Sequence, residues 1–309
     1  MSAPRPEKVF VSGCASFIGA EFLRLCAARG IETAGADLNP PAGPLFVKSD
    51  VRDPAIADAI PERVDAIVHL AAMSRDPDCR GKARQCFDVN VMGTLNMIEA
   101  AERRRARQFV FASSEWVYEA ASPSAGEMDE DEPLDPSRCS SEYALSKLVS
   151  EANLRQKHRR GFCPVAILRF GITYGPRRDN WSAVESLFFD AATKDVVTVG
   201  SARTARRFTH VADIASGILA SVGLEGFNVV NIAGDRLVSL GDIVETTGRL
   251  TGRRPSLVET APQTPSVRNV SNARARALLG WRPAVDLERG LRTLMCLLPT
   301  GAAPGEPAG

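Results

Sequence analysis

Short apolar runs alternate with longer helical patterns along the first half of the chain. The apolar runs fall at about 8–12, 31–37, 66–72, 108–114 and 164–170, and segments with helical spacing of apolar residues separate most of them. Runs such as "KVFV" and "AIVHL" lack the strict apolar–polar alternation of a half-exposed strand. Strands that are buried on both faces and separated by helices form parallel sheets. The pattern therefore predicts an α/β fold built on a doubly wound parallel sheet.

The alternation loosens after residue 174, where "GPRRDN" (175–180) is typical of a boundary. The segment beyond this boundary mixes helical and short strand patterns, such as "VVTVG" (196–200) and "NVVNIAG" (228–234). We therefore expect a first domain over 1–175 and a smaller mixed α/β lobe over 176–298. Segments of about 205–233 are expected to return to the first domain. The last stretch, 299–309, is rich in Gly, Pro and Ala and predicts a disordered tail.

Composition narrows the class of protein without naming a function. The 309 residues carry a formal net charge of +1, which gives no reason to expect nucleic acid or a membrane as partner. No apolar run approaches the length of a membrane span. The seven cysteines and three histidines lack metal-ligand spacing, so no metal site is expected. The dispersed cysteines and the lack of a signal-peptide pattern predict a cytoplasmic protein.

The first apolar run leads into "SGCASFIGAEF", a loop that opens a helix. A phosphate at that helix N-terminus would meet free backbone N–H groups and the positive end of the helix dipole. Gly13 would permit the tight turn, and Gly19 the close packing of helix on strand. Asp37 ends the second strand about 20 residues further on, where an acid bonds the adenosine ribose. Because a carboxylate would repel a 2′-phosphate, the pattern favours NAD over NADP.

A second set of residues predicts a reacting centre. Tyr143 and Lys147 stand four apart at the start of a helical pattern, hence on one face. A lysine ammonium close to the phenol would favour the phenolate and make the tyrosine a usable base near neutrality. Ser114 ends a predicted parallel strand, and ligands of open parallel sheets bind beyond the carboxyl ends of strands. We therefore expect Ser114, Tyr143 and Lys147 to act together.

The chain resembles the extended short-chain dehydrogenase/reductases, specifically the NAD-dependent nucleotide-sugar epimerase/dehydratase family. The resemblance runs from about residue 8 to about residue 297, and its motifs occur in order: "VSGCASFIG", "SDVRD", "HLAA", "NVMGT", "SSEWVY", "YALSK", "LRFGITYGPR", "RRFTHVAD" and "LLGWRP". It implies a Rossmann-like domain that binds NAD and carries the catalytic residues, beside a substrate lobe. It also implies a nucleotide-diphosphate sugar as substrate and a homodimer.

The resemblance assigns roles to particular positions. Ser114, Tyr143 and Lys147 become the catalytic triad, and Lys147 would also hold the nicotinamide ribose. Arg206 matches an arginine that contacts the sugar-nucleotide diphosphate, and Arg268 matches a second one; the fork of an arginine suits phosphate. Asn90 would support the backbone of the active site. The implied cofactor contacts are Gly13, Ser16, Phe17, Ile18, Gly19, Asp37, Asp50, Val51, Leu70, Ala71, Ala72, Asn90, Tyr143 and Lys147.

The chain departs from the family pattern at several positions. Ser16 and Cys14 stand where glycines are frequent in the loop; the Ser16 hydroxyl can bond phosphate, but close approach of the backbone is harder. Ile172 replaces an asparagine that contacts the substrate diphosphate. The change at Ser16 bears on the affinity for the cofactor, and the change at Ile172 removes one expected contact to the diphosphate.

The stretch "SSEWVYE" (113–119) bears on the choice of reaction. In the 4,6-dehydratases of the family, an acid and then a base follow the catalytic serine or threonine. Glu115 occupies the acid position, but Trp116 occupies the base position, and an indole has no basic site. This favours an NAD-dependent 4-epimerase, which oxidises and re-reduces C4 with the Tyr–Ser–Lys set alone. Glu115 would then contact the sugar as a specificity residue, although an acid at a strand end can simply bond the local backbone.

Two alternatives stay open from the sequence. One is another enzyme of the family, a 4,6-dehydratase with a base from elsewhere or a 4-ketoreductase or dehydrogenase. The other is a regulatory or scaffold protein that binds NAD without turnover.

Overall fold

A computed structural model describes residues 6–121 and 126–298. Its main sheet has seven parallel strands in the order β11-β6-β5-β4-β1-β2-β3. These strands are β1 (Lys8–Ser12), β2 (Glu32–Asp37), β3 (Phe46–Lys48), β4 (Ala66–His69), β5 (Phe109–Ser114), β6 (Val165–Phe170) and β11 (Phe227–Ile232). The predicted doubly wound α/β fold is confirmed. The predicted tail at 299–309 lies outside the described residues.

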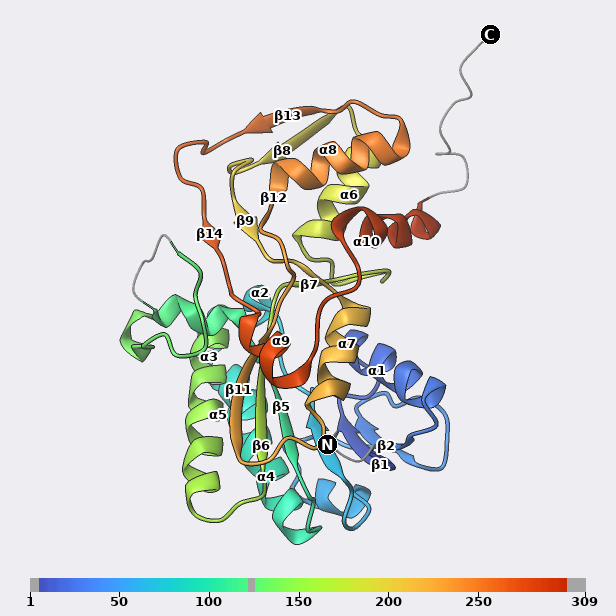
Figure 1. Ribbon diagram of the computed structural model, residues 1–309, viewed down its shortest axis with the longest axis vertical. Coiled ribbons are helices and arrows are strands. Elements are labelled where there is room, and N and C mark those ends of the chain that lie inside the picture. The colour runs from blue at the N-terminus through green and yellow to red at the C-terminus, as the bar shows by residue number, and fades with distance from the viewer. Residues whose placement is uncertain (1–5, 122–125, 299–309) are drawn as a thin grey trace.

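Helices cover both faces of this sheet (Figure 1). The helices packed on it or beside its upper edge are α1 (Phe17–Ala28), α2 (Asp76–Cys79), α3 (Ala83–Phe87), α4 (Gly93–Arg103), α5 (Glu142–Arg159), α7 (Val211–Ser221) and α9 (Ala273–Leu279). Successive strand residues enter opposite cores: Val9 and Val11 pack with α1, α7 and α9, whereas Phe10 packs with α4 and α5. Because both faces of each strand are buried, the strands show no apolar–polar alternation.

The remaining elements form a smaller group above the carboxyl ends of the strands (Figure 1). They are β7 (Thr173–Tyr174), α6 (Ala183–Thr193), β8 (Val196–Val199), β9 (Ala205–Arg206), β10 (Thr209–His210), β12 (Val238–Ser239), α8 (Leu240–Thr251), β13 (Ser256–Glu259), β14 (Val267–Arg268) and α10 (Leu287–Leu294). This group has its own apolar core, to which Phe188 and Ile243 belong. The domain limits at 175 and 298 stay a prediction, while α7 and β11 do lie with the main sheet.

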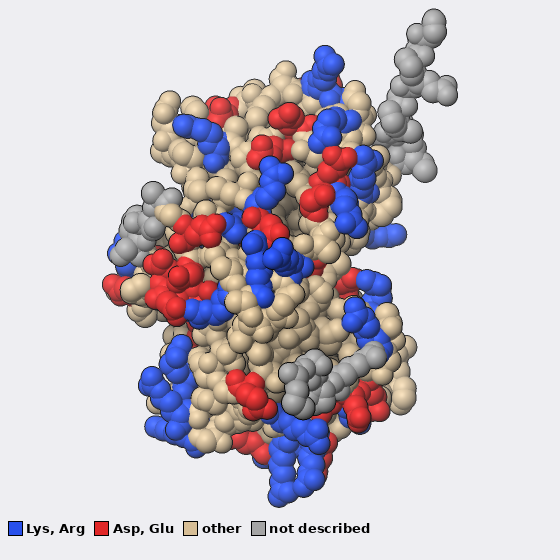
Figure 2. Space-filling model, viewed as in Figure 1, with Lys and Arg blue, Asp and Glu red and all other residues tan. Residues whose placement is uncertain are grey.

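Two properties of the surface and of the helices accompany this fold. On the face shown in Figure 2, acidic and basic side chains are interspersed rather than gathered into one broad area of a single sign. Every helix within residues 6–121 and 126–298 is too short or too polar to cross a membrane. The same residues contain no group of three or more His, Cys, Asp or Glu side chains that could hold a metal ion.

Candidate active site

Ser114 and Tyr143 meet at the carboxyl end of the main sheet. Ser114 is the last residue of β5, and a 3-10 turn, Glu115–Ala120, begins directly after it. Tyr143 lies in the first turn of α5, where the Ser141 hydroxyl caps the helix by accepting the Ala144 backbone N–H at 3.3 Å. The Ser114 hydroxyl lies close enough to the Tyr143 phenol to favour its ionised form. The structure thus brings together two residues that the sequence predicted would act together.

Lys147 follows one turn later on the buried face of α5. Its Nζ donates to the Ala112 carbonyl at 2.7 Å and lies 5.8 Å from the centroid of the Tyr143 ring. Burial lowers the pKa of Lys147 to about 8. Burial also raises the pKa of Tyr143 to about 12, and the nearby Ser114 hydroxyl opposes this rise only in part. Burial thus opposes the effect that we expect Lys147 to have on the phenol, and the role of Lys147 in making Tyr143 a usable base stays a prediction.

Asn90 joins the active-site helix to the segment after β4. Its Oδ1 accepts the Met73 backbone N–H at 2.8 Å, and its Nδ2 donates to the Ser146 hydroxyl at 2.9 Å. Asn90 is 2% exposed, so each of these bonds replaces one that water would otherwise make. These are the contacts that a residue supporting the active-site backbone needs.

Ser113, the first serine of "SSEWVYE", has a different environment from Ser114. Its hydroxyl donates to the Glu151 carboxylate at 2.5 Å. Glu151 in turn forms a buried ion pair with Arg169 of β6 at 2.8 Å. Alternate residues of a strand point to opposite faces, so Ser113 ties β5 to α5 and β6 while Ser114 faces Tyr143.

The loop between β1 and α1 has the conformation that the sequence predicts. Gly13 has φ +73°, and a Cβ there would lie 2.7 Å from the Ala71 backbone nitrogen. A Cβ on Gly19 would lie 2.2 Å from the Gly13 carbonyl oxygen. Only glycine fits either position without shifting backbone. The tight turn and the close approach of α1 to the strands are thereby confirmed.

The N-terminus of α1 fits a phosphate. The helix has no acidic residue in its first turn, and within the described residues the backbone N–H groups of Phe17 and Ile18 have no acceptor. Such free N–H groups at the positive end of a helix dipole bind anions. The Ser16 hydroxyl caps the helix by accepting the Gly19 N–H at 3.1 Å. Its own proton can still be donated to a phosphate oxygen.

Cys14, the other departure in this loop, packs into the core. The residue is fully buried with α1 and the sheet, and burial raises the pKa of its thiol to about 11. A Cβ on Gly35 of β2 would lie 2.8 Å from the Cβ of Cys14. The thiol therefore fills space beneath the loop and does not occupy the side where a phosphate would bind.

Asp37 ends β2 and holds the same loop. Its Oδ2 accepts the Ala15 backbone N–H at 3.0 Å, and its Oδ1 accepts that of Asn39 at 3.0 Å. The carboxylate is thus a strand-end acid bonded to local backbone, placed beside the loop where a ribose would lie. Holding the loop and bonding a ribose are compatible roles, because each carboxylate oxygen can accept more than one hydrogen bond.

The other predicted cofactor residues follow β3 and β4, at the same edge of the sheet. The Asp50 carboxylate is held by Arg52 at 2.6 Å, and this hydrogen bond lowers the pKa of Asp50. The Val51 side chain is buried against Gly93 of α4. The segment after β4 comprises Leu70, Ala71 and Ala72 and lies over the Gly13 turn. The Leu70 N–H donates to the Ser12 carbonyl at 3.0 Å.

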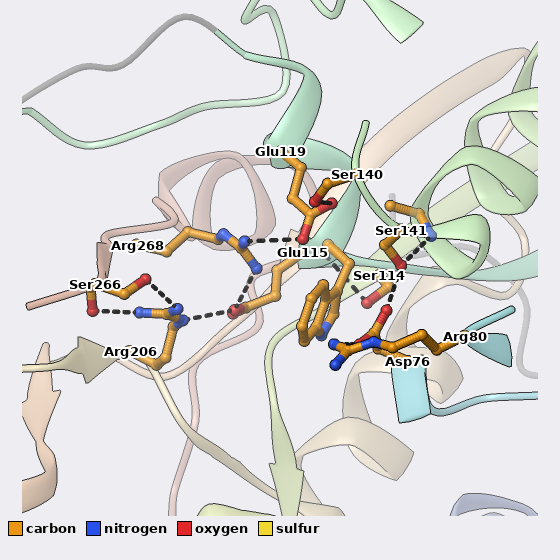
Figure 3. A network of polar contacts seen from close by, with 12 residues as sticks. Asp76, Arg80, Ser114, Glu115, Glu119, Ser140, Ser141, Arg206, Ser266 and Arg268 are labelled. Atoms are coloured by element: carbon orange, nitrogen blue, oxygen red, sulfur yellow. Dashed lines mark hydrogen bonds and ion pairs between the residues drawn. The ribbon is translucent and has the colours of Figure 1, made fainter. Parts of the chain in front are cut away.

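Glu115 lies between the two predicted substrate arginines (Figure 3). Its Oε1 is 3.5 Å from Nε of Arg206 and 3.4 Å from Nη1 of Arg268. The arginines are partners across the parallel pair β9 and β14. Burial raises the pKa of Glu115. The charges of Arg268 and Arg206, the hydrogen bond from Arg268 and the Ile172 backbone N–H lower it. The structure thus unites three predicted residues from three distant segments.

Trp116 forms part of the wall around Tyr143. It is partly buried and packs with Cys79, Cys86 and Met73 beside the Tyr143 ring. The Arg268 guanidinium carbon lies 5.2 Å from the Trp116 ring centroid, a cation–π contact. The sequence pattern did not identify the two cysteines as neighbours of Tyr143, because their spacing resembles neither a metal site nor a redox motif.

A family model matches residues 9–233 of this chain and is described as the NAD dependent epimerase/dehydratase family. The chain belongs to this family. NAD is accordingly its cofactor, and the loop at the N-terminus of α1 has the free N–H groups and glycines that a dinucleotide requires.

Individual relatives within the family carry different activities. A UDP-glucuronate 4-epimerase of Thermodesulfobacterium geofontis is 27% identical, with 74% of this chain and 71% of the relative covered. A dTDP-glucose 4,6-dehydratase of Streptomyces niveus is 27% identical, with 92% and 90% covered. The solved structure of Thermus thermophilus UDP-glucose 4-epimerase in complex with NAD has a TM-score of 0.81 and 25% identity, with 94% and 98% covered. The comparisons thus establish an enzyme family rather than one reaction.

Proposed function

We propose that the protein is an NAD-dependent nucleotide-sugar 4-epimerase. The observation that carries this proposal is the composition of the site around Ser114 and Tyr143. Trp116 stands where a dehydratase of this family has its base, and it supplies no group that accepts a proton. Glu115 faces two arginines, whose positive charges favour its carboxylate form over the proton donor that a leaving hydroxyl would need. The remaining groups are the Tyr–Ser–Lys set, which is all that an epimerase needs.

In the proposed mechanism, Tyr143 removes the proton from O4 of the sugar and later returns it. Bound NAD supplies the acceptor and donor of the hydride at C4. The Ser114 hydroxyl bonds the same O4 and orients it toward the phenol. Lys147 stabilises the phenolate electrostatically. The raised pKa of Tyr143 makes it a strong base once ionised, and positive charge brought close to the phenol would lower that pKa.

We propose that the chain holds NAD through residues at one edge of the sheet. The N–H groups of Phe17 and Ile18 with the Ser16 hydroxyl would bind the pyrophosphate, and Asp37 the adenosine ribose. Asp50 and Val51 would flank the adenine. Lys147 would hold the nicotinamide ribose. Leu70, Ala71 and Ala72 would line the cleft, with Asn90 supporting it.

The proposed substrate is a nucleotide-diphosphate sugar, whose diphosphate would meet Arg206 and Arg268. UDP is the nucleotide that we propose, because it occurs in the names of the two related epimerases. A homodimer stays a prediction from the family resemblance, as does a cytoplasmic location.

Product analysis in deuterated water separates the epimerase from its rivals. The purified protein is first analysed by mass spectrometry for retained NAD and then given a panel of UDP-, dTDP-, GDP- and CDP-sugars. We expect a product that differs only in configuration at C4, with no solvent deuterium at C5 or C6. Deuterium at C5 or C6 would identify a dehydratase, and net consumption of NADH would identify a reductase. Binding of NAD without turnover of any nucleotide sugar would favour a regulatory protein.

A further inference from the structure

Glu115 is a buried acid next to Ser114 in the chain, and it has one oxygen without a partner. The residue is 0% exposed. Its Oε1 faces Arg206 and Arg268, whereas Oε2 has no hydrogen-bond partner within the described residues. Figure 3 shows the side chain reaching between the two guanidinium groups. A buried acceptor without a donor is unfavourable, so this position suits a ligand that brings a donor.

The positive charges of the two arginines are already shared among acids. Both pair with Glu115, and Nη2 of Arg268 also lies 3.9 Å from Glu119. The other acceptors of Arg206 are neutral, namely the carbonyl and the hydroxyl of Ser266 and the carbonyl of Ala205. Two cations thus face two carboxylates. A bound diphosphate would add further negative charge. Neither arginine would then be free to pair with another anion on the sugar.

From this arrangement we infer that Glu115 restricts the substrate to nucleotide sugars whose sugar is uncharged, hexoses or N-acyl aminohexoses, and excludes uronic acids. The inference rests on the proposed function, because it concerns the sugar held beside Ser114. A uronate carboxylate is attached to C5, the neighbour of the reacting C4, and would come close to a carboxylate that burial shields from water. Like charges repel strongly in such a medium. A uronate also offers only acceptors there, whereas a hydroxyl or amide offers a donor to Oε2.

The test compares two ligands that differ only at C6. The dissociation constants of UDP-glucose and UDP-glucuronate are measured by calorimetry on NAD-saturated protein carrying Tyr143→Phe, so that neither ligand reacts. We expect UDP-glucuronate to bind at least about 100-fold more weakly. Adding Glu115→Gln should reduce this ratio at least tenfold, because the variant keeps the shape and removes the charge. Any effect of the variant on the diphosphate is common to both ligands and cancels in the ratio.

Glu119→Gln is the matched control. It removes one negative charge from the same group of residues, and the Glu119 side chain is more exposed than that of Glu115 (15% against 1%). Because water screens its charge more, the variant should change the ratio less than about threefold. An equal effect of both variants would mean that net charge, not Glu115, selects the sugar, and would overturn the inference. Equal binding of the two ligands by protein with Glu115 intact would also overturn it, even if the Gln variant failed to fold. Tight UDP-glucose binding without epimerisation by the unmodified protein would reject the proposed function and leave this inference standing.

Discussion

At the scale of single residues, burial decides the chemistry of the site more than sequence spacing does. Tyr143 and Lys147 stand one helical turn apart, as their spacing requires, yet burial raises the pKa of the phenol and lowers that of the amine. Both shifts disfavour the charged forms that catalysis uses. The protein therefore holds the two groups close together in an environment where added positive charge has a large effect.

The substitution Tyr143→Phe tests the role of the phenol. It removes one hydroxyl and leaves a ring that fills the same space beside Cys79 and Cys86. We expect kcat to fall by about 10²–10⁴-fold, the usual contribution of an acid–base group, while NAD binding changes little. Loss of the polar contact with Ser114 should lower the free energy of unfolding by no more than about 1 kcal/mol. Steady-state kinetics gives kcat, titration of NADH fluorescence gives cofactor affinity, and urea unfolding gives the stability. An undiminished kcat would remove Tyr143 from the mechanism.

At the scale of elements, the turn between β1 and α1 depends on contacts from β2. Asp37 accepts the Ala15 N–H, and Gly35 leaves room for the Cys14 side chain. The loop is therefore positioned by its neighbouring strand, as well as by its own glycines. This arrangement lets Cys14 and Ser16 replace glycine without filling the space in front of Phe17 and Ile18.

Two substitutions at Asp37 separate its charge from its hold on the loop. Asn can still accept the Ala15 N–H but carries no charge, so Asp37→Asn should mainly relax the preference for NAD over NADP. Ala removes the acceptor as well, so Asp37→Ala should weaken the binding of both dinucleotides by about fivefold or more, corresponding to about 1 kcal/mol. Dissociation constants of NADH and NADPH measure the effect. Tighter binding of NADPH than NADH by the unmodified protein would show that Asp37 does not select the cofactor.

At the scale of the whole molecule, a neutral histidine lies in the centre of the sheet beneath the site. His69 ends β4 and is 1% exposed. Its Nδ1 is 2.6 Å from the Ser12 hydroxyl, and its Nε2 is 3.0 Å from that of Thr94. Burial, with a smaller effect from the charge of Lys147, lowers the pKa of His69 to about 3. The folded protein therefore excludes a proton that the unfolded chain binds.

This histidine should make the fold sensitive to acid. Because the pKa is about 3 in the folded state and 6.5 ordinarily, the unfolded state binds the extra proton between these values, and stability falls as pH falls through this window. Between pH 7 and pH 4, His69 should lower the free energy of unfolding by about 3 kcal/mol. The free energy of unfolding of the His69→Gln variant should fall correspondingly less over the same pH interval, whatever its value at pH 7. Urea unfolding at the two pH values measures this, and equal losses in both proteins would contradict the assignment.

Local patterns in the sequence determined the fold class and several parts of the site. Unbroken apolar strands predicted a sheet covered on both faces, and the structure confirms it. Gly13 and Gly19 predicted a tight turn and close packing, which the positive φ of Gly13 and the missing Cβ atoms of both bear out. The four-residue spacing of Tyr143 and Lys147 placed both on one face of α5. Each of these inferences depends on neighbours in the chain, and backbone periodicity relates such neighbours directly.

Only the tertiary structure decided what Glu115 faces and how Tyr143 titrates. Glu115 meets Arg206 and Arg268 because β9 and β14 pair side by side above the end of β5. No periodicity in the chain relates these segments, since their contact depends on strand register and on how the smaller group of elements packs on the sheet. The pKa of Tyr143 likewise depends on how completely distant segments exclude water from its hydroxyl. Burial and pairing between remote segments are properties of the packed molecule, and they are absent from any short stretch of sequence.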